Sequence, residues 1–315
     1  IIIPSAMPAH GVKHRLVYNA KFGSELPGEL VRKEGDNPTG DVAVDEAYDG
    51  TGMTYDLYHD IFNRNSLDDQ GMQLISTVHY LEGYDNAFWD GEQMVFGDGD
   101  EDLPESERLF NRFTIAFDII GHELTHGVTE HSAELVYWDQ PGALNESFSD
   151  VFGILVKQRM LNHTAEQADW LIGKGLFTEN VNGDALRSMK EPGTAYDDAV
   201  IGKDPQPGHM KDYLHTVSDN GGVHINSGIP NRAFYLAATG IGGYAWEKAG
   251  KIWYLTLKDK LNERSDFQDA ANKTVQVAGE LFGNKSNEQQ AVINAWNEVG
   301  ITVNAVSKSG CNFFR

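Results

Sequence analysis

Residues 118–126 read Asp-Ile-Ile-Gly-His-Glu-Leu-Thr-His, which places a His-Glu-x-x-His pattern inside a predicted helix. Positions i and i+4 of a helix lie on the same face, so His122 and His126 can bind one metal ion between them. Glu123 follows the first histidine and lies within reach of a water on that ion. This spacing is typical of zinc hydrolases, although two histidines four residues apart also occur in helices that bind no metal.

A second segment supplies a third ligand. Residues 145–150 read Asn-Glu-Ser-Phe-Ser-Asp and precede an apolar run, which predicts a second helix. Catalytic zinc uses three protein ligands and one open position for water, and Glu146 completes the set that the two histidines begin. Asp150 lies one turn later on the same face, where it can accept the ring N–H of a metal-binding histidine. Taken alone, both residues would be ordinary helix carboxylates.

A third segment adds His224, a polar side chain that could act at the predicted zinc site. Residues 219–228 read Asp-Asn-Gly-Gly-Val-His-Ile-Asn-Ser-Gly, a glycine-rich loop that leads into a helix. Asp219 can hold His224 so that a ring N–H points at a cleft, where it would stabilise a developing oxyanion. An isolated loop histidine is more often incidental, so this interpretation depends on the other two segments.

Together the three segments resemble the thermolysin-like family of neutral zinc metallopeptidases. The resemblance runs from about Tyr48 to Gly300. Residues 84–89 and 97–100 resemble the family's substrate-binding edge strand and the turn after it. Residues 183–189 resemble the stretch that carries its substrate-binding arginine. The N-terminal part resembles that of the protealysin-like branch.

The resemblance implies a zinc-dependent endopeptidase and assigns a role to each catalytic residue. Zinc on the three ligands would lower the pKa of its water and polarise the scissile carbonyl. Glu123 would take the proton of that water and pass it to the leaving amine. His224 and Tyr137 would stabilise the oxyanion. The role of Tyr137 comes from the family pattern alone, since an aromatic residue at such a position is usually packed.

The resemblance also implies a substrate site. Asn86 and Ala87 match a pair on an edge strand that binds the substrate backbone by β-augmentation. Arg187 matches an arginine that contacts a substrate carbonyl, although a structural salt bridge is its ordinary role. Phe113 stands where a smaller aliphatic residue is common, so the pocket would be shallower if its ring projects inward. Five apolar residues, each equally suited to a plain core, match pocket positions and imply a preference for a hydrophobic residue after the scissile bond: Phe110, Phe113, Ile119, Leu176 and Leu186.

Calcium binding is expected to be reduced relative to the family. Asp118 and Asp169 match carboxylates of a double calcium site, whereas Lys157 and Lys174 replace other ligands. Ammonium groups cannot coordinate calcium, so lysine–carboxylate pairs are predicted in place of that site. The acidic turn at residues 98–101 is expected to be solvated rather than calcium-binding. A separate single-calcium site is implied by two further matches: Thr178 and Asp184.

The pattern along the chain predicts an α+β protein with a β-rich N-terminal domain at residues 1–116 and a helical C-terminal domain at 117–315. The zinc site is expected in the cleft between them. Strands are predicted at residues 14–18 and 74–80, and an irregular stretch at about 178–222. Helices are predicted at residues 54–70, 117–131, 142–161, 225–240, 243–262, 266–282 and 286–298.

Composition limits the partners. The chain has 315 residues, with 25 Lys and Arg against 47 Asp and Glu, which gives a formal net charge of −22. Such a surface repels nucleic acid and anionic membranes, so peptides and proteins remain as substrates. No apolar run approaches the roughly 18 residues of a membrane span. Cys311 is the single cysteine, which excludes an intramolecular disulfide.

The chain begins Ile1-Ile2-Ile3-Pro4 without an initiating Met or a signal peptide, so a processed or trimmed chain is expected. The resemblance implies a precursor, with the propeptide as an inhibitor of the mature enzyme. A secreted monomer is expected, with an intracellular bacterial enzyme of the protealysin type as the alternative. The roles of the segment Ile1–Gly11 and of the tail that contains Cys311 stay open.

Three other functions compete with the endopeptidase. An aminopeptidase would need acidic residues that capture a free N-terminus, and none is identified in the sequence. A binding module that keeps the fold without activity is disfavoured by the intact set of Glu123, His224 and Tyr137. A calcium-dependent adhesion or scaffold protein would use the acidic surface, and its function would not respond to a zinc chelator.

Overall fold

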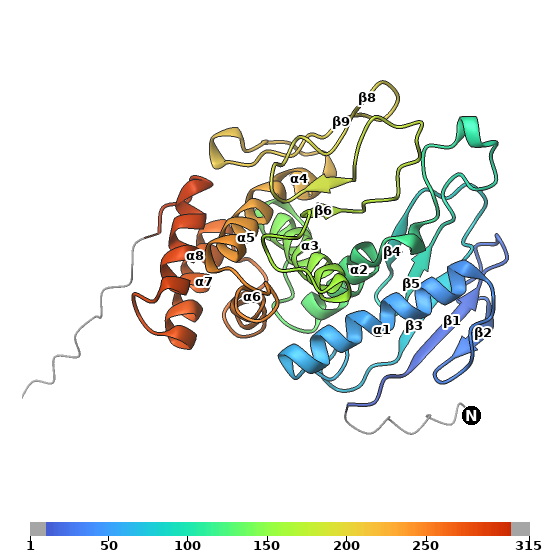
Figure 1. The fold of residues 1–315 in the computed structure, drawn as a ribbon, viewed down its shortest axis with the longest axis horizontal. Coiled ribbons are helices and arrows are strands. Elements are labelled where there is room, and N and C mark those ends of the chain that lie inside the picture. The colour runs from blue at the N-terminus through green and yellow to red at the C-terminus, as the bar shows by residue number, and fades with distance from the viewer. Residues whose placement is uncertain (1–10, 304–315) are drawn as a thin grey trace, which may run out of the picture.

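The computed structural model describes residues 11–303. The questions about residues 1–10 and about the tail with Cys311 therefore lie outside the described residues. Within the described range, a β-rich N-terminal region is followed by a helical C-terminal region (Figure 1). The predicted α+β class is confirmed. No helix in this range is long and apolar enough to cross a membrane.

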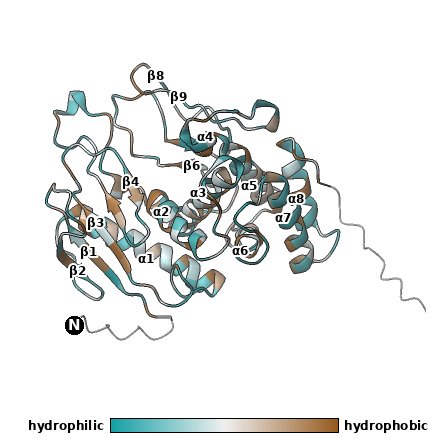
Figure 2. Cartoon of the chain, turned by 180° about the vertical axis from the view of Figure 1, so that it is seen from behind, coloured by the Kyte–Doolittle hydropathy of each residue, from teal (hydrophilic) through white to brown (hydrophobic). Residues whose placement is uncertain are grey.

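The N-terminal region is organised around a five-stranded sheet in the order β2-β1-β3-β5-β4. Strands β1, β3 and β5 are parallel, whereas β2 and β4 run antiparallel at the two edges. In Figure 2 hydrophobic residues lie along inner strand β3. Within residues 11–303, β4 pairs on one side only, so its free edge is available to another strand. The strands are β1 (Arg15–Asn19), β2 (Glu29–Lys33), β3 (Leu74–Val78), β4 (Ala87–Trp89) and β5 (Met94–Phe96).

Helix α1 (Val42–Phe62) packs against the sheet and α2, and it begins twelve residues before the predicted helix at 54–70. The prediction was wrong because it overlooked the cap. Asp41 accepts hydrogen bonds from the backbone N–H groups of Ala43 and Val44, which starts the helix there. Asn63 then adopts a left-handed conformation with φ of 53° and ends it.

Helices α2 (Phe117–Glu130) and α3 (Asp139–Leu161) cross in direct main-chain contact. A Cβ added to Gly121 would lie 3.0 Å from the Cα of Gly153. A Cβ added to Gly153 would lie 2.3 Å from the carbonyl oxygen of Asp118. Only hydrogen fits at these two positions, so the two glycines set the separation of the helices. Both helices were predicted, with α3 starting three residues earlier than expected.

The rest of the C-terminal region is helical around an irregular middle stretch, as predicted. The predicted helix at 225–240 is divided at Ser227, which lies between α4 and α5. Residues 220–222, which precede it, have positive φ and interrupt the helical path inside α4. The stretch before it contains the two-residue strands β6 (Leu171–Ile172), β7 (Arg187–Ser188), β8 (Asp197–Asp198) and β9 (Gly202–Lys203). The remaining helices are α4 (Asp219–Asn226), α5 (Gly228–Ile241), α6 (Ala249–Asp259), α7 (Phe267–Phe282) and α8 (Asn287–Glu298).

His79, the residue after β3, links two distant parts of the N-terminal region. Its Nδ1 lies 2.6 Å from Asp98 Oδ2, and its Nε2 lies 3.0 Å from Asp41 Oδ2. The acidic turn at 98–101 is therefore not simply solvated, since the Asp98 side chain is only 16% exposed. The hydrogen bond to Asp98, helped by the charges of both carboxylates, raises the pKa of His79 to about 9.

This pair of contacts makes stability depend on pH. Because the folded pKa of His79 lies above its unfolded value of about 6.5, its contribution is full below pH 6.5 and is lost as pH rises through 9. We expect His79→Gln to lower the free energy of unfolding by on the order of 2 kcal/mol at pH 6, after solvent screening. Urea unfolding from pH 6 to 10 measures the difference, which should fade toward pH 10. A difference independent of pH would contradict the charge assignment.

Candidate active site

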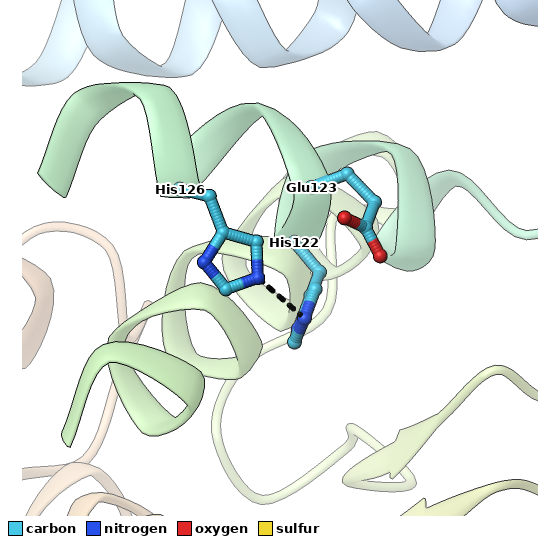
Figure 3. A group of neighbouring side chains, drawn as sticks. All are labelled: His122, Glu123 and His126. Carbon is cyan, nitrogen blue, oxygen red and sulfur yellow. Dashed lines mark hydrogen bonds between the residues drawn. The ribbon is translucent and has the colours of Figure 1, made fainter. Parts of the chain in front are cut away.

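Helices α2 and α3 bring three metal-binding side chains together. His122 and His126 leave the same side of α2, and their Nε2 atoms lie 3.2 Å apart (Figure 3). Glu146 of α3 approaches both, with Oε2 at 3.3 Å from His122 Nε2 and Oε1 at 3.6 Å from His126 Nε2. The glycine contact between the helices makes this approach close enough for one ion to touch all three.

The donor set fits zinc. A tetrahedral zinc with Zn–N bonds of about 2.0–2.1 Å holds its ligand atoms roughly 3.3 Å apart, which is the spacing of these donors. Burial lowers the pKa of His122, but the charges of Asp150 and Glu146 outweigh it and raise that pKa to about 10. The site therefore favours a positive charge, which a proton or a zinc ion can supply.

Asp150 contacts the first histidine, for which the sequence predicts an orienting role. It is fully buried and accepts His122 Nδ1–H at 2.7 Å. Arg187 donates to both of its oxygens at 2.8 and 2.6 Å, and Asn231 donates to Oδ2 at 2.7 Å. Burial raises the pKa of Asp150, yet the Arg187 and His122 charges hold it well below its usual range. Sequence reasoning missed Asn231, which lies 81 positions after Asp150 in the chain.

His126 has its own partners, which sequence reasoning also missed. Its Nδ1 lies 2.8 Å from Asn145 Oδ1 and 3.3 Å from Ser149 Oγ. Both partners lie on α3 within one turn of Glu146. Their helical spacing was a usable signal, because Asn145 and Ser149 are four positions apart and share one face of α3.

A cavity of about 450 Å³ opens over the metal ligands. Its walls come from β4, α2, α3 and α4, and both predicted edge-strand residues, Asn86 and Ala87, line it. Glu123 lies on its floor and accepts the backbone N–H of Trp89 at 3.2 Å. The main chain of the edge strand therefore holds the carboxylate that the motif predicts as the general base.

Tyr137 and His224 also line this cavity. The Tyr137 hydroxyl donates to Glu146 Oε1 and lies 3.2 Å from His224 Nε2. Asp219 holds His224 as predicted, with Oδ1 at 2.6 Å from Nδ1 and Oδ2 accepting the backbone N–H at 2.8 Å. The two side chains thus converge on one point beside the metal ligands.

A second cavity, of about 340 Å³, adjoins the first, and His224 lines both. Three predicted substrate residues lie in its wall: Phe110, Leu186 and Arg187. Phe113, Ile119 and Leu176 are buried outside the wall, and Phe113 packs on Phe110 with ring centroids 6.0 Å apart. Sequence reasoning missed the other wall residues, among them Phe177, Tyr196 and Gln206.

Models of known protein families match nearly the whole chain. The model described as "Thermolysin metallopeptidase, catalytic domain" matches residues 10–130. The model described as "Thermolysin metallopeptidase, alpha-helical domain" matches residues 133–301. The chain belongs to the thermolysin family of metallopeptidases. Its architecture is the two-domain fold of that family, and the protein is a zinc metalloendopeptidase.

Individual relatives agree with this assignment to the thermolysin family. The extracellular metalloprotease of Pectobacterium carotovorum subsp. carotovorum is 55% identical over 298 residues, which cover 94% of this chain and 83% of that protein. Protease PrtS of Photorhabdus sp. (strain Az29) is 54% identical, covering 94% of this chain and 78% of that protein. A solved structure, the precursor of protealysin, a metalloproteinase from Serratia proteamaculans, superposes with a TM-score of 0.90 at 57% identity, covering 95% of this chain and 90% of its own. The last match agrees with the predicted protealysin-like branch.

Lys157 and Lys174 form the lysine–carboxylate pairs that the sequence predicts. Lys157 Nζ lies 3.3 Å from Asp118 Oδ2 and 3.1 Å from Asp169 Oδ1, and Lys174 Nζ lies 3.3 Å from Asp169 Oδ2. At the predicted single-calcium site, Thr178 donates its hydroxyl to the carbonyl of Arg108 at 2.5 Å. No hydrogen bond joins Thr178 to Asp184 within residues 11–303. Calcium binding stays a prediction at both places.

Replacing Lys157 should destabilise the fold. Burial raises the pKa of Asp118, and the nearby Lys157 charge opposes it. We expect Lys157→Met to lower the free energy of unfolding by about 3 kcal/mol at pH 7, because it leaves a buried carboxylate without its cation. The matched change Lys174→Met removes a partly exposed pair and should cost less than about 1 kcal/mol. Urea unfolding measures both. Two tight, coupled calcium sites found by calorimetry in the unaltered protein would contradict the replacement.

Proposed function

We propose that this metallopeptidase cleaves internal peptide bonds and prefers a hydrophobic residue directly after the scissile bond. The observation that carries the proposal is the second cavity. Phe110 and Leu186 give it apolar walls, and His224 lies between it and the metal ligands. A side chain that enters it would follow the bond whose carbonyl lies at the metal. Arg187 lines the same cavity, where a guanidinium edge can donate to a substrate carbonyl.

The free edge of β4 supports binding of internal segments. An extended substrate that pairs with the main chain at Asn86 and Ala87 would use backbone hydrogen bonds common to all peptides. Such pairing needs no free terminus, which favours an endopeptidase. Selectivity would then come from the side-chain cavity rather than from the strand.

The chain's own residues account for the proton transfers. Zinc held by His122, His126 and Glu146 would act as a Lewis acid toward water and the scissile carbonyl. Glu123, fixed by the backbone N–H of Trp89, would accept the proton of the attacking water and deliver it to the leaving nitrogen. Water loses one proton and the amine gains one, so Glu123 returns to its carboxylate form.

His224 and Tyr137 would donate hydrogen bonds to the developing oxyanion. Because Asp219 accepts the Nδ1–H of His224, Nε2 carries a proton only when the ring is an imidazolium. The imidazolium is therefore the form that can stabilise the oxyanion. The Tyr137 hydroxyl lies beside it and would have to turn from Glu146 toward the substrate.

The proposal is tested with an end-blocked peptide that contains one internal Gly-Leu bond. We expect cleavage before Leu, loss of cleavage after 1,10-phenanthroline, and recovery when zinc is restored. A matched peptide with Gly-Asp in place of Gly-Leu should be cleaved poorly, because no apolar contact replaces that of the leucine. Equal cleavage of both peptides would contradict the side-chain preference. Cleavage that needs a free N-terminus would favour an aminopeptidase, and cleavage that resists the chelator would argue against zinc.

We also propose that the enzyme acts outside the cell as a monomer, under control of a propeptide. Two observations support the location and the propeptide: one relative is named an extracellular metalloprotease, and the solved relative is named a precursor. An intracellular bacterial enzyme of the protealysin type is the alternative. The division into domains at residues 116 and 117 stays a proposal. Binding of a single calcium ion at Thr178 and Asp184 is likewise a proposal.

A further inference from the structure

Gln206 is a buried side chain in the wall of the second cavity that touches the segment carrying His224. It is 5% exposed, although it lies in the irregular stretch before α4. Its Nε2 lies 2.7 Å from the carbonyl oxygen of His224 and 3.0 Å from the hydroxyl of Ser227. A carbonyl only accepts hydrogen bonds, so the amide nitrogen of Gln206 must face it.

His224 depends on such contacts because packing does not hold it. Its side chain is 53% exposed. The three residues before Val223 have φ of 47°, 85° and 80°, so no regular helical turn supports His224 from its N-terminal side. Asp219 binds the backbone N–H and the ring Nδ1. Gln206 binds the carbonyl at the other end of the same residue at 2.7 Å, and the Ser227 hydroxyl donates to that carbonyl at 3.0 Å. Asp219 and Gln206 thus contact both backbone polar groups of His224, with Gln206 making the shorter of the two contacts to the carbonyl.

Gln206 is itself firmly placed. Asp204, which is 4% exposed, accepts the backbone N–H of Gln206 at 3.1 Å through Oδ1. The other oxygen of Asp204 accepts the backbone N–H groups of Gly193 and Ala195 at 3.0 and 3.1 Å. On the opposite side, a Cβ added to Gly228 would lie 2.9 Å from the Cβ of Gln206. The first residue of α5 therefore packs directly on Gln206.

The oxygen of the same amide, Gln206 Oε1, bears on the role of the side chain. Gln206 Oε1 is buried and accepts no hydrogen bond from any residue in the described range. An unpaired buried acceptor destabilises the folded state, because it loses its hydrogen bonds to water and gains none in the protein. A methionine of similar length would avoid that cost but would lose the contact of Nε2 with His224. The glutamine is therefore poor for packing alone and suited to holding the His224 carbonyl.

We propose that Gln206 is a positioning residue for turnover, which acts by fixing the backbone of His224 so that its ring faces the reacting carbonyl. The proposal rests on the proposed function, because it assumes that His224 stabilises the oxyanion. It also separates Gln206 from its neighbours in the second cavity. Phe110 and Leu186 would affect substrate binding, whereas Gln206 would affect the rate of the chemical step.

The test compares Gln206→Met, His224→Ala and the double variant on the end-blocked Gly-Leu peptide. We expect Gln206→Met to lower kcat about tenfold with KM changed less than about twofold, as for the loss of one buried hydrogen bond. His224→Ala should lower kcat by about 10²–10³. The double variant should match His224→Ala within about twofold, because Gln206 acts only through that ring. Gln290→Met, the same change at an exposed residue of α8, should leave kcat and KM unchanged.

Each other outcome overturns the proposal in a recognisable way. An equal fold-loss from Gln206→Met with and without His224 would mean that it acts on the fold or the metal ligands. A rise in KM with unchanged kcat would make Gln206 a pocket wall. An unchanged kcat in His224→Ala would overturn the oxyanion role itself, and the positioning role with it. If Gln206→Met does not fold, Gln206→Leu also removes the donor with a smaller apolar side chain and carries the same expectations.

Discussion

Glu123→Gln is expected to abolish nearly all peptidase activity while zinc stays bound. The substitution keeps the shape of the side chain and an oxygen that can accept the backbone N–H of Trp89, but it removes the basic carboxylate. General base catalysis of this kind contributes up to about 10⁴-fold, so kcat should fall by at least about 10³-fold. Initial rates on the end-blocked peptide and the zinc content per chain are the two measurements.

The control for this prediction is Glu134→Gln, an equivalent change at an exposed residue beyond the end of α2. It should retain both activity and zinc. Loss of zinc from Glu123→Gln would mean that Glu123 is a ligand, which the approach of Glu146 to both histidines argues against. Residual activity above about a tenth of the original rate would remove Glu123 from the role of general base.

Asp150→Asn is expected to have the largest effect on stability. Asp150 is fully buried between His122, Arg187 and Asn231, and its charge compensates the guanidinium. Breaking a buried ion pair by removing one partner costs about 3–5 kcal/mol. Loss of the carboxylate that orients a metal-binding histidine should also weaken zinc binding by about 10–100-fold. Urea unfolding and zinc competition with a chelating dye measure the two effects separately.

Asp56→Asn provides the comparison, because Asp56 pairs with Lys13 at 2.8 Å on the surface. It should change the free energy of unfolding by less than about 1 kcal/mol and leave zinc affinity intact. If Asp150→Asn lost stability but kept full zinc affinity, Asp150 would serve the fold and not the metal site. If it behaved like Asp56→Asn, the buried pair with Arg187 would contribute nothing.

The part of the site that the sequence could predict is the part with local spacing. His122, Glu123 and His126 are related by the pitch of one helix, so their shared face follows from the pattern alone. Glu146 and Asp150 follow by the same argument on a second helix. That the two helices meet was predicted only because catalytic zinc needs a third protein ligand. The fold class could be predicted because β-rich and helical patterns occupy different halves of the chain.

What the sequence could not predict depends on contacts between distant segments. The N–H of Trp89 binds Glu123 through the main chain, which carries no residue signature. Asn231 and Gln206 are separated from their partners, Asp150 and His224, by irregular segments of the chain. No sequence periodicity therefore relates them. The start of α1 differs from the prediction for a local reason: Asp41 caps the helix and so begins it at Val42.

The touching glycines of α2 and α3 have a consequence for the choice of ion. Since no side chain lies between the main chains at Gly121 and Gly153, the gap cannot close, and tight packing elsewhere keeps it from widening. The metal site therefore has a fixed size and three protein ligands: His122, His126 and Glu146. Calcium, which takes six to eight oxygens at about 2.3–2.6 Å, matches neither the number nor the span, whereas a small tetrahedral ion does. The close helix spacing at Gly121 and Gly153 would thus favour binding of small ions over larger ones.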